Sequence, residues 1–148
     1  MKRLLFALLL SSMTGAVMAQ ERTSELFAVV KTSKDPNFQK IQKDSVVIKK
    51  EIGASQYHSR LSRLIFKGDI EPMFAEAKTW DEISKTLESK YGDVGEEAYL
   101  VTRVGISMQM KQWPEYLPLA KRLLEKYGSH LSEADRKKHE EAIKANQK

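Results

Sequence analysis

Histidines and acidic residues near the C-terminus are the side chains of this chain best suited to metal or acid–base chemistry. His130 and His139 are nine residues apart with Asp135 between them, and imidazole with carboxylate is a common ligand set for zinc. Nine residues of helix make about two and a half turns, so the two imidazoles would point to opposite faces. We therefore expect no metal site and no other cofactor.

Nucleophilic catalysis requires a nucleophile beside a base, and the spacing of residues predicts no such set. Asp135 and His139 are one helical turn apart, but no hydroxyl or thiol is positioned as their nucleophile. His58 is a single titratable group. The adjacent Glu96 and Glu97 would point in different directions from a helix, which does not give a carboxylate pair. The sequence therefore predicts a noncatalytic protein.

The first 19 residues have the features of a cleavable export signal. Two cationic residues precede an apolar run over residues 4–10, and small residues follow it up to Ala19. The run is shorter than the roughly 20 residues that a transmembrane helix needs. We expect cleavage between Ala19 and Gln20, which leaves residues 20–148 as one exported domain without a transmembrane segment. The periplasm is favoured over secretion.

The chain contains no cysteine. Exported proteins meet an oxidising compartment in which disulfides are common. This chain is therefore neither a disulfide-stabilised scaffold nor a dithiol redox catalyst. The 129 residues after the expected signal are enough for a core that folds without disulfides or metal.

Basic residues concentrate in one stretch of the expected mature chain. Residues 20–148 have a net charge of +3, whereas residues 31–67 alone have a net charge of +6. Such a stretch can bind phosphates or anionic lipid headgroups, which we keep as an alternative function. The candidate residues for this surface are Lys40, Lys43, Lys49, Lys50, Arg60 and Arg63. No aromatic residues alternate with the lysines to stack on bases, which argues against nucleic acid.

Apolar residues recur at helical spacing through the C-terminal half. The pattern predicts four helices, over residues 80–91, 94–111, 114–127 and 132–145. Thr79 and Glu82 form a capping box, and Gly92 follows the first helix. The second helix is apolar on more than one side and should be central, and the last should be an outer cover. Pro118 should kink the third helix or delay its start.

Residues 36–67 are predicted to form a small β-hairpin followed by a helix. Val46, Ile48 and Ile52 alternate with Val47, Lys49 and Glu51 in a run rich in β-branched residues, which favours a strand that ends at Gly53. Apolar residues after Gly53 fit a short helix, which would end at Gly68. The hairpin would be the only β-structure in a mostly α fold.

Two of the predicted helices share residues at similar spacing. Trp80 and Trp113 each have a glutamate two residues later, and the helices close with Lys-Tyr-Gly at residues 90–92 and 126–128. An offset of 33 to 36 residues is typical of tetratricopeptide arrays, in which each helical hairpin packs on the next. Helical hairpins of similar length also arise without repetition.

The segment from Glu97 to Gly128 resembles one degenerate tetratricopeptide unit, in which Gly105 would allow close helix approach. The resemblance implies antiparallel helical hairpins over residues 79–146. The fold class that we expect is therefore mostly α, with tetratricopeptide-like hairpins and a small β-hairpin near the N-terminus.

The order of elements also resembles the final third of a thioredoxin fold and the helical region that follows it in some exported bacterial thioredoxin-like proteins. The residues that carry this resemblance are Pro36-Asn37-Phe38, Val46-Val47-Ile48, Gly53, Trp80, Tyr91-Gly92, Trp113-Pro114 and Tyr127-Gly128. Only residues 20–35 lie between the expected signal and Pro36, which leaves no room for the Cys-x-x-Cys half. The resemblance implies a remnant without redox activity, because no thiolate is present.

We expect a protein-binding or accessory module of the cell envelope, whose partner is another envelope protein or a peptide. Helix 94–111 has more apolar residues than one buried face requires. If a partner covers the surplus, Tyr99, Met110 and Trp113 are the expected contacts, since aromatic and Met side chains dominate adaptable binding surfaces. Otherwise the N-terminal segment of the same chain covers it. The sequence leaves both possibilities and the oligomeric state open.

The export signal gives a direct prediction for the exported protein. Its intact mass should correspond to a chain that begins at Gln20, because Ala19 offers the small side chain that signal peptidase requires. An exported product that retains residues 1–19 would contradict the prediction.

Overall fold

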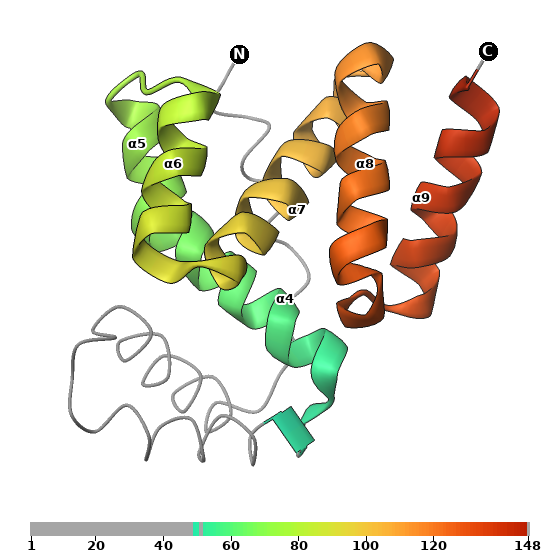
Figure 1. The fold of residues 1–148 in the computed structure, drawn as a ribbon, viewed down its shortest axis with the longest axis horizontal. Helices are drawn as coiled ribbons and strands as arrows, with labels where there is room; N and C mark the ends of the chain where they lie inside the picture. The colour runs from blue at the N-terminus through green and yellow to red at the C-terminus, as the bar shows by residue number, and fades with distance from the viewer. Residues whose placement is uncertain (1–48, 51, 148) are drawn as a thin grey trace.

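The computed structural model describes residues 49–50 and 52–147, which are almost entirely helical (Figure 1). The elements in chain order are α4 (Ala54–Ile65), the π-helical turn η1 (Phe66–Ile70), α5 (Glu71–Ala75), α6 (Trp80–Tyr91), α7 (Asp93–Gln109), α8 (Trp113–Tyr127), the 3-10 turn η2 (Gly128–His130) and α9 (Glu133–Asn146). This confirms a mostly α fold. None of the helices in these ranges is both long enough and apolar enough to cross a membrane.

The helix predicted after Gly53 is confirmed by α4, whereas the described residues just before Gly53 differ from the predicted strand. Lys49, Lys50 and Ile52 are helical rather than extended. Ile52 packs beside Tyr57 and Leu61. In the sequence it follows Ile48 by four residues, a spacing that fits one face of a helix as well as one face of a strand. The rest of the predicted β-hairpin, with Lys40 and Lys43, and the predicted signal with Ala19 and Gln20 lie outside the described residues.

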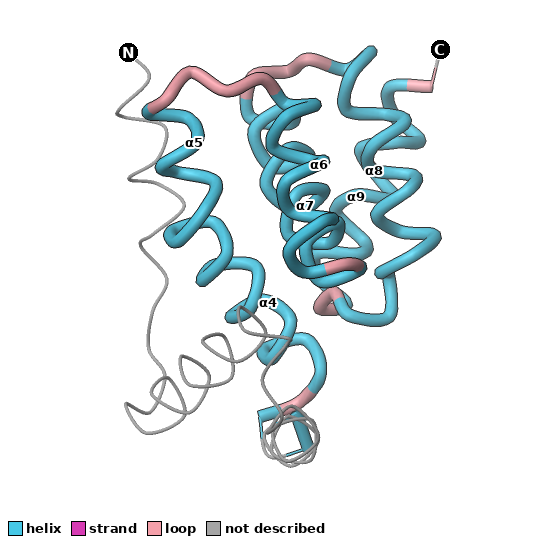
Figure 2. The backbone as a smooth tube through the Cα atoms, turned by 60° about the vertical axis from the view of Figure 1, so that its left-hand side comes forward, coloured by secondary structure: helices cyan, strands magenta, loops and turns pink. Residues whose placement is uncertain are grey.

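Gly68 does not end the helix that contains it, contrary to the prediction. It lies within η1, and α4, η1 and α5 follow one another without an intervening loop (Figure 2). Ile65 and Ile70 are both fully buried although they are five residues apart. The wider turn of a π-helix, with its i→i+5 hydrogen bonds, keeps both isoleucines on the buried side.

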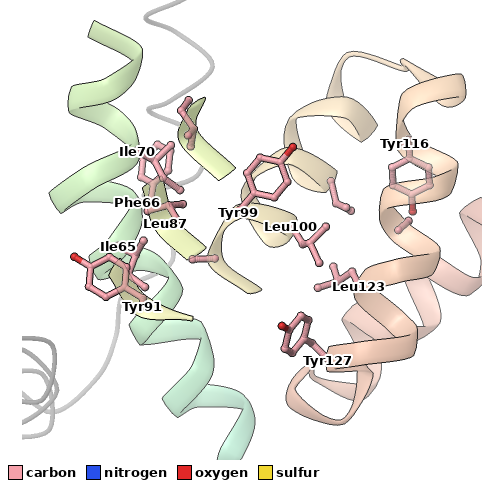
Figure 3. Packing of buried hydrophobic residues seen from close by; sticks show 14 of the residues in the cluster. Ile65, Phe66, Ile70, Leu87, Tyr91, Tyr99, Leu100, Tyr116, Leu123 and Tyr127 are labelled. Carbon is pink, nitrogen blue, oxygen red and sulfur yellow. The ribbon is translucent and has the colours of Figure 1, made fainter. Parts of the chain in front are cut away.

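Helix α7 is central, as its apolar residues predicted. It packs against α4, α6 and α8, while α9 covers the outer side of α8 (Figures 1 and 2). One core cluster extends from Ile65 at the end of α4 to Ile143 in α9. In the close view, Tyr99 and Leu100 of α7 lie between the apolar residues of η1 and α6 and those of α8 (Figure 3).

The helix ends are fixed by the capping residues that the sequence indicated. The Glu82 N–H donates to Thr79 Oγ1 at 3.3 Å, and the Thr79 N–H donates to Glu82 Oε2 at 2.7 Å. Ser132 caps α9 by accepting from the Asp135 N–H at 3.1 Å. Pro118 lies inside α8 and does not delay its start. The carbonyl that loses a donor there belongs to Pro114, which is exposed to water.

Helices α6 and α7 approach each other closely at Gly95. A Cβ atom at this position would lie 2.1 Å from the backbone oxygen of Leu87, which is impossible without a backbone shift. Gly105, where the sequence predicted the close approach, has no heavy atom within 4 Å of a Cβ position. The close approach therefore depends on Gly95, and Gly105 borders open space.

Replacement of these two glycines by alanine should have opposite effects. Gly95→Ala should lower the free energy of unfolding by about 1–3 kcal/mol, because the helices must separate to accommodate the methyl group. Gly105→Ala should raise it by roughly 0.5–1 kcal/mol, because alanine is the better helix former and meets no neighbour. Urea denaturation of both variants measures this difference. An equal loss of stability in both would contradict the packing described here.

Candidate functional site

A groove with a volume of about 320 Å³ crosses one face of α7, between α4 and the segment that leads from η2 into α9. Apolar side chains from η1, α7, α8 and the segment after η2 contribute to its lining: Phe66, Val101, Met108, Leu123 and Leu131. Polar side chains line the α4 and α9 walls: Ser55, His58, Ser59, Ser62, Arg63, Asp135, Lys138 and His139. Gly105 also borders the groove, so the missing side chain leaves space there.

Three ionisable side chains from three separate elements meet in this groove. His58 of α4 and His130 of η2 place their Nδ1 atoms 3.1 Å and 3.0 Å from Oε2 of Glu97 in α7. The two imidazole rings are stacked, with centroids 3.5 Å apart and planes inclined by 10°. In this geometry each Nδ1–H donates to the same carboxylate oxygen. The cluster therefore ties α4 and η2 to the central helix.

Glu96 is also buried, and its partners lie on α8. Arg122 and Lys126 form ion pairs with its carboxylate, and the Tyr127 hydroxyl donates to Oε2 at 2.8 Å. Burial alone would raise the pKa of Glu96, but the hydrogen bonds from Lys126, Tyr127 and Arg122 outweigh it and hold the pKa below its usual value. The adjacent carboxylates of α7 thus have different partners, cationic for Glu96 and imidazole for Glu97.

His58 is not paired with a hydroxyl group in this groove. His58 Nε2 is buried and has no hydrogen-bond partner, so no hydroxyl of the described residues is aligned with it for deprotonation. The serines on α4 line the groove without forming a nucleophile–base pair with this histidine. The arrangement is suited to binding by apolar contact and hydrogen bonds.

The three side chains predicted to contact a partner do not share one surface. Tyr99 is only 7% exposed, packs edge-on against Trp80 and accepts a hydrogen bond from Arg103. Met110 is 53% exposed at the end of α7. Trp113 is partly buried and packs edge-on against Tyr116. Helix α6 of the same chain therefore covers Tyr99.

The predicted basic surface is only partly within the described residues. Lys50 is exposed, and Lys49, Arg60 and Arg63 are partly buried. Of these four, Arg63 lines the groove. His139 bonds with its Nδ1 to the Tyr116 hydroxyl at 2.9 Å and does not join the cluster formed by His130.

The cluster of His58, Glu97 and His130 was not predicted from the sequence. These residues are 39 and 33 positions apart, and their meeting depends on how α4 and η2 pack on α7. One signal was present, because Glu96 and Glu97 directly precede a run of apolar residues in the most apolar helix. Acids at such positions are buried and need partners from other elements.

Comparisons of the chain with protein-family models, with curated proteins and with solved structures found no match. The groove is therefore interpreted from its own geometry.

The lowered pKa of Glu96 predicts how the stability of the fold changes with pH. Because the pKa of Glu96 in the folded protein is below the ordinary value of a glutamate, ionised Glu96 stabilises the fold above that ordinary pKa, and this contribution is lost as the pH falls through the lower folded pKa. Glu96→Gln should reduce stability at neutral pH by roughly 1.5–3 kcal/mol, since charged hydrogen bonds are lost. The same substitution should also reduce the loss in free energy of unfolding that the native chain shows as the pH becomes acidic.

Urea unfolding at a series of pH values measures both effects. Glu125→Gln, at an exposed position of α8, is the matched control and should leave the profile unchanged. If the free energy of unfolding falls equally steeply at acidic pH in the native chain and in Glu96→Gln, the predicted role of Glu96 is wrong.

Proposed function

We propose that this chain is a noncatalytic, exported binding module of the cell envelope, and that its groove holds a segment of another envelope protein or a peptide. The observation that carries the proposal is the groove itself, whose lining combines apolar side chains with polar side chains from α4 and α9. Binding sites typically have this composition, in which apolar contact gives affinity and a few polar groups set orientation.

The groove is held open by contacts that do not depend on a ligand. Glu97 connects α7 with both walls of the groove through His58 and His130. Glu96 connects the same helix with α8. A preformed groove favours binding, because less conformational entropy is lost when the partner enters.

The two Lys-Tyr-Gly sequences have the same structural role, which supports a proposed relationship to tetratricopeptide arrays. Lys90 and Tyr91 at the end of α6 donate to buried Asp69 at 2.7 Å and 2.6 Å. Lys126 and Tyr127 at the end of α8 donate to buried Glu96 in the same way. In each case the acid lies in the helical segment just before, as expected for repeated units that stack.

Export is part of the proposal and rests on the N-terminal sequence, in which cationic, apolar and small residues follow one another in the order of a signal peptide. A module without cysteine suits an oxidising compartment, because it has no thiol to oxidise. The periplasm is the proposed location.

Filling the groove tests the proposed function. The mature chain, residues 20–148, serves as bait in envelope extract, and Gly105→Leu adds a side chain where the groove has free space. We expect this variant to melt normally but to lose the partner that the native chain captures. The matched control is Met110→Ser, which changes an exposed side chain outside the groove and should retain that partner.

Salt separates this function from binding through the basic stretch. Capture in the groove should persist as ionic strength rises, whereas a complex held by exposed charges weakens once the Debye length falls to about 3 Å at 1 M salt. Undiminished capture by folded Gly105→Leu, or capture that disappears in salt, would contradict the proposal.

A further inference from the structure

We propose that His58, Glu97 and His130 together bind one divalent transition-metal ion of the zinc type. This inference concerns a metal site and does not depend on the groove holding a protein segment. The two imidazoles and the carboxylate can each offer one ligand atom, and these three atoms lie within 4.8 Å of one another. They come from α4, α7 and η2, so the packing of the domain assembles the site.

The distances within the cluster are close to those of a tetrahedral zinc site. Zinc binds nitrogen and oxygen ligands at about 2.0–2.2 Å, which in a tetrahedron separates neighbouring ligand atoms by about 3.3 Å. The two Nδ1 atoms lie 3.1 Å and 3.0 Å from Oε2 of Glu97. These two nitrogen–oxygen distances are therefore slightly shorter than the spacing that a bound ion would require.

The charge of Glu97 points to a cation. Its side chain is 5% exposed, and its ion-pair partners within the described part of the chain are the two histidines, which carry charge only when protonated. The other two buried acids, Glu96 and Asp69, are paired with Lys or Arg. Glu97 therefore has hydrogen-bond donors but no Lys or Arg beside it among the described residues, and a divalent ion would supply a positive charge next to its carboxylate.

Metal binding requires one of the stacked rings to turn. Nitrogen lone pairs lie in the plane of the imidazole, so two nearly parallel rings cannot both point at one ion. His130 is the ring free to turn, because its side chain is 26% exposed and it lies on the short turn η2 at the groove wall. His58 is held within α4 at 11% exposure.

The protons of the histidines can be redistributed without breaking other contacts. Each Nδ1 must lose its proton to bind the ion, and the neutral ring then carries the proton on Nε2. His58 Nε2 makes no hydrogen bond, so no existing partner opposes this change of tautomer. The groove leaves the fourth coordination position open to water or to a side chain of a bound partner.

Calorimetric titration of the chelator-treated mature chain with Zn²⁺ tests the site. We expect one ion per chain and a higher melting temperature. His58→Gln and His130→Gln should weaken binding by at least roughly 100-fold, since even losing a residue that only orients a ligand costs 10–100-fold. His139→Gln is the matched control, because this third histidine lies in the groove wall but outside the cluster.

A second variant guards against loss of folding. His130→Cys replaces one zinc ligand by another and should bind Zn²⁺ where His130→Gln does not. Nuclear magnetic resonance of the imidazole ring protons should also show that the stacking of His58 and His130 is lost on binding. The proposal is wrong if the native chain binds no Zn²⁺, if His130→Gln binds as tightly as the native chain, or if His139→Gln removes binding.

Discussion

The central constraint in this structure is that α7 places two adjacent carboxylates, Glu96 and Glu97, inside the domain. A buried charge costs several kcal/mol unless it is paired and hydrogen-bonded, so the neighbouring elements must bring donors to both. Glu96 receives them from α8, and Glu97 receives them from α4 and η2. The positions of three elements around α7 follow from this requirement as well as from the apolar core.

The same type of contact fixes the other side of the domain. Asp69 in η1 pairs with Lys90 and accepts a hydrogen bond from Tyr91 of α6. Arg103 of α7 pairs with Glu115 of α8 at 2.6 Å and also lies over the ring of Trp80 in α6. These polar contacts have a defined geometry, which apolar packing alone does not impose. The groove is therefore a consequence of fixed helix positions.

The sequence predicted those features of the fold that depend on nearby residues. Helix α6 was predicted with its observed bounds, because Thr79, Glu82 and Gly92 mark its ends within a few residues. Of the two effects predicted for Pro118, the delayed start is wrong, because α8 already begins at Trp113. The strand before Gly53 was predicted from alternation over a few residues, a pattern that a short helix shares.

The candidate site could not be predicted because its residues are distant in the sequence. The nine-residue spacing of His130 and His139 was interpreted as continuous helix, but His130 lies in η2 before α9 begins. The spacing also says nothing about His58, whose ring stacks on His130 through packing of separate elements. Tyr99 was assigned to a partner surface because helix periodicity does not reveal that α6 covers a second face of α7. Local sequence patterns thus predicted the helices, whereas the site is determined by packing contacts between helices that are distant in the sequence.

The central claim is that the buried acids of α7 hold α4, α7 and α8 as one preformed unit. Native-state hydrogen exchange of the mature chain tests it, because it measures the free energy of opening for each helix separately. We expect the inner amides of α4, α7 and α8 to exchange through a single global unfolding event. Their free energies of opening should then fall with the same slope as denaturant is added. Exchange of α4 through a separate opening of lower free energy, while α7 and α8 stay protected, would show that the groove is not preformed and would contradict the account.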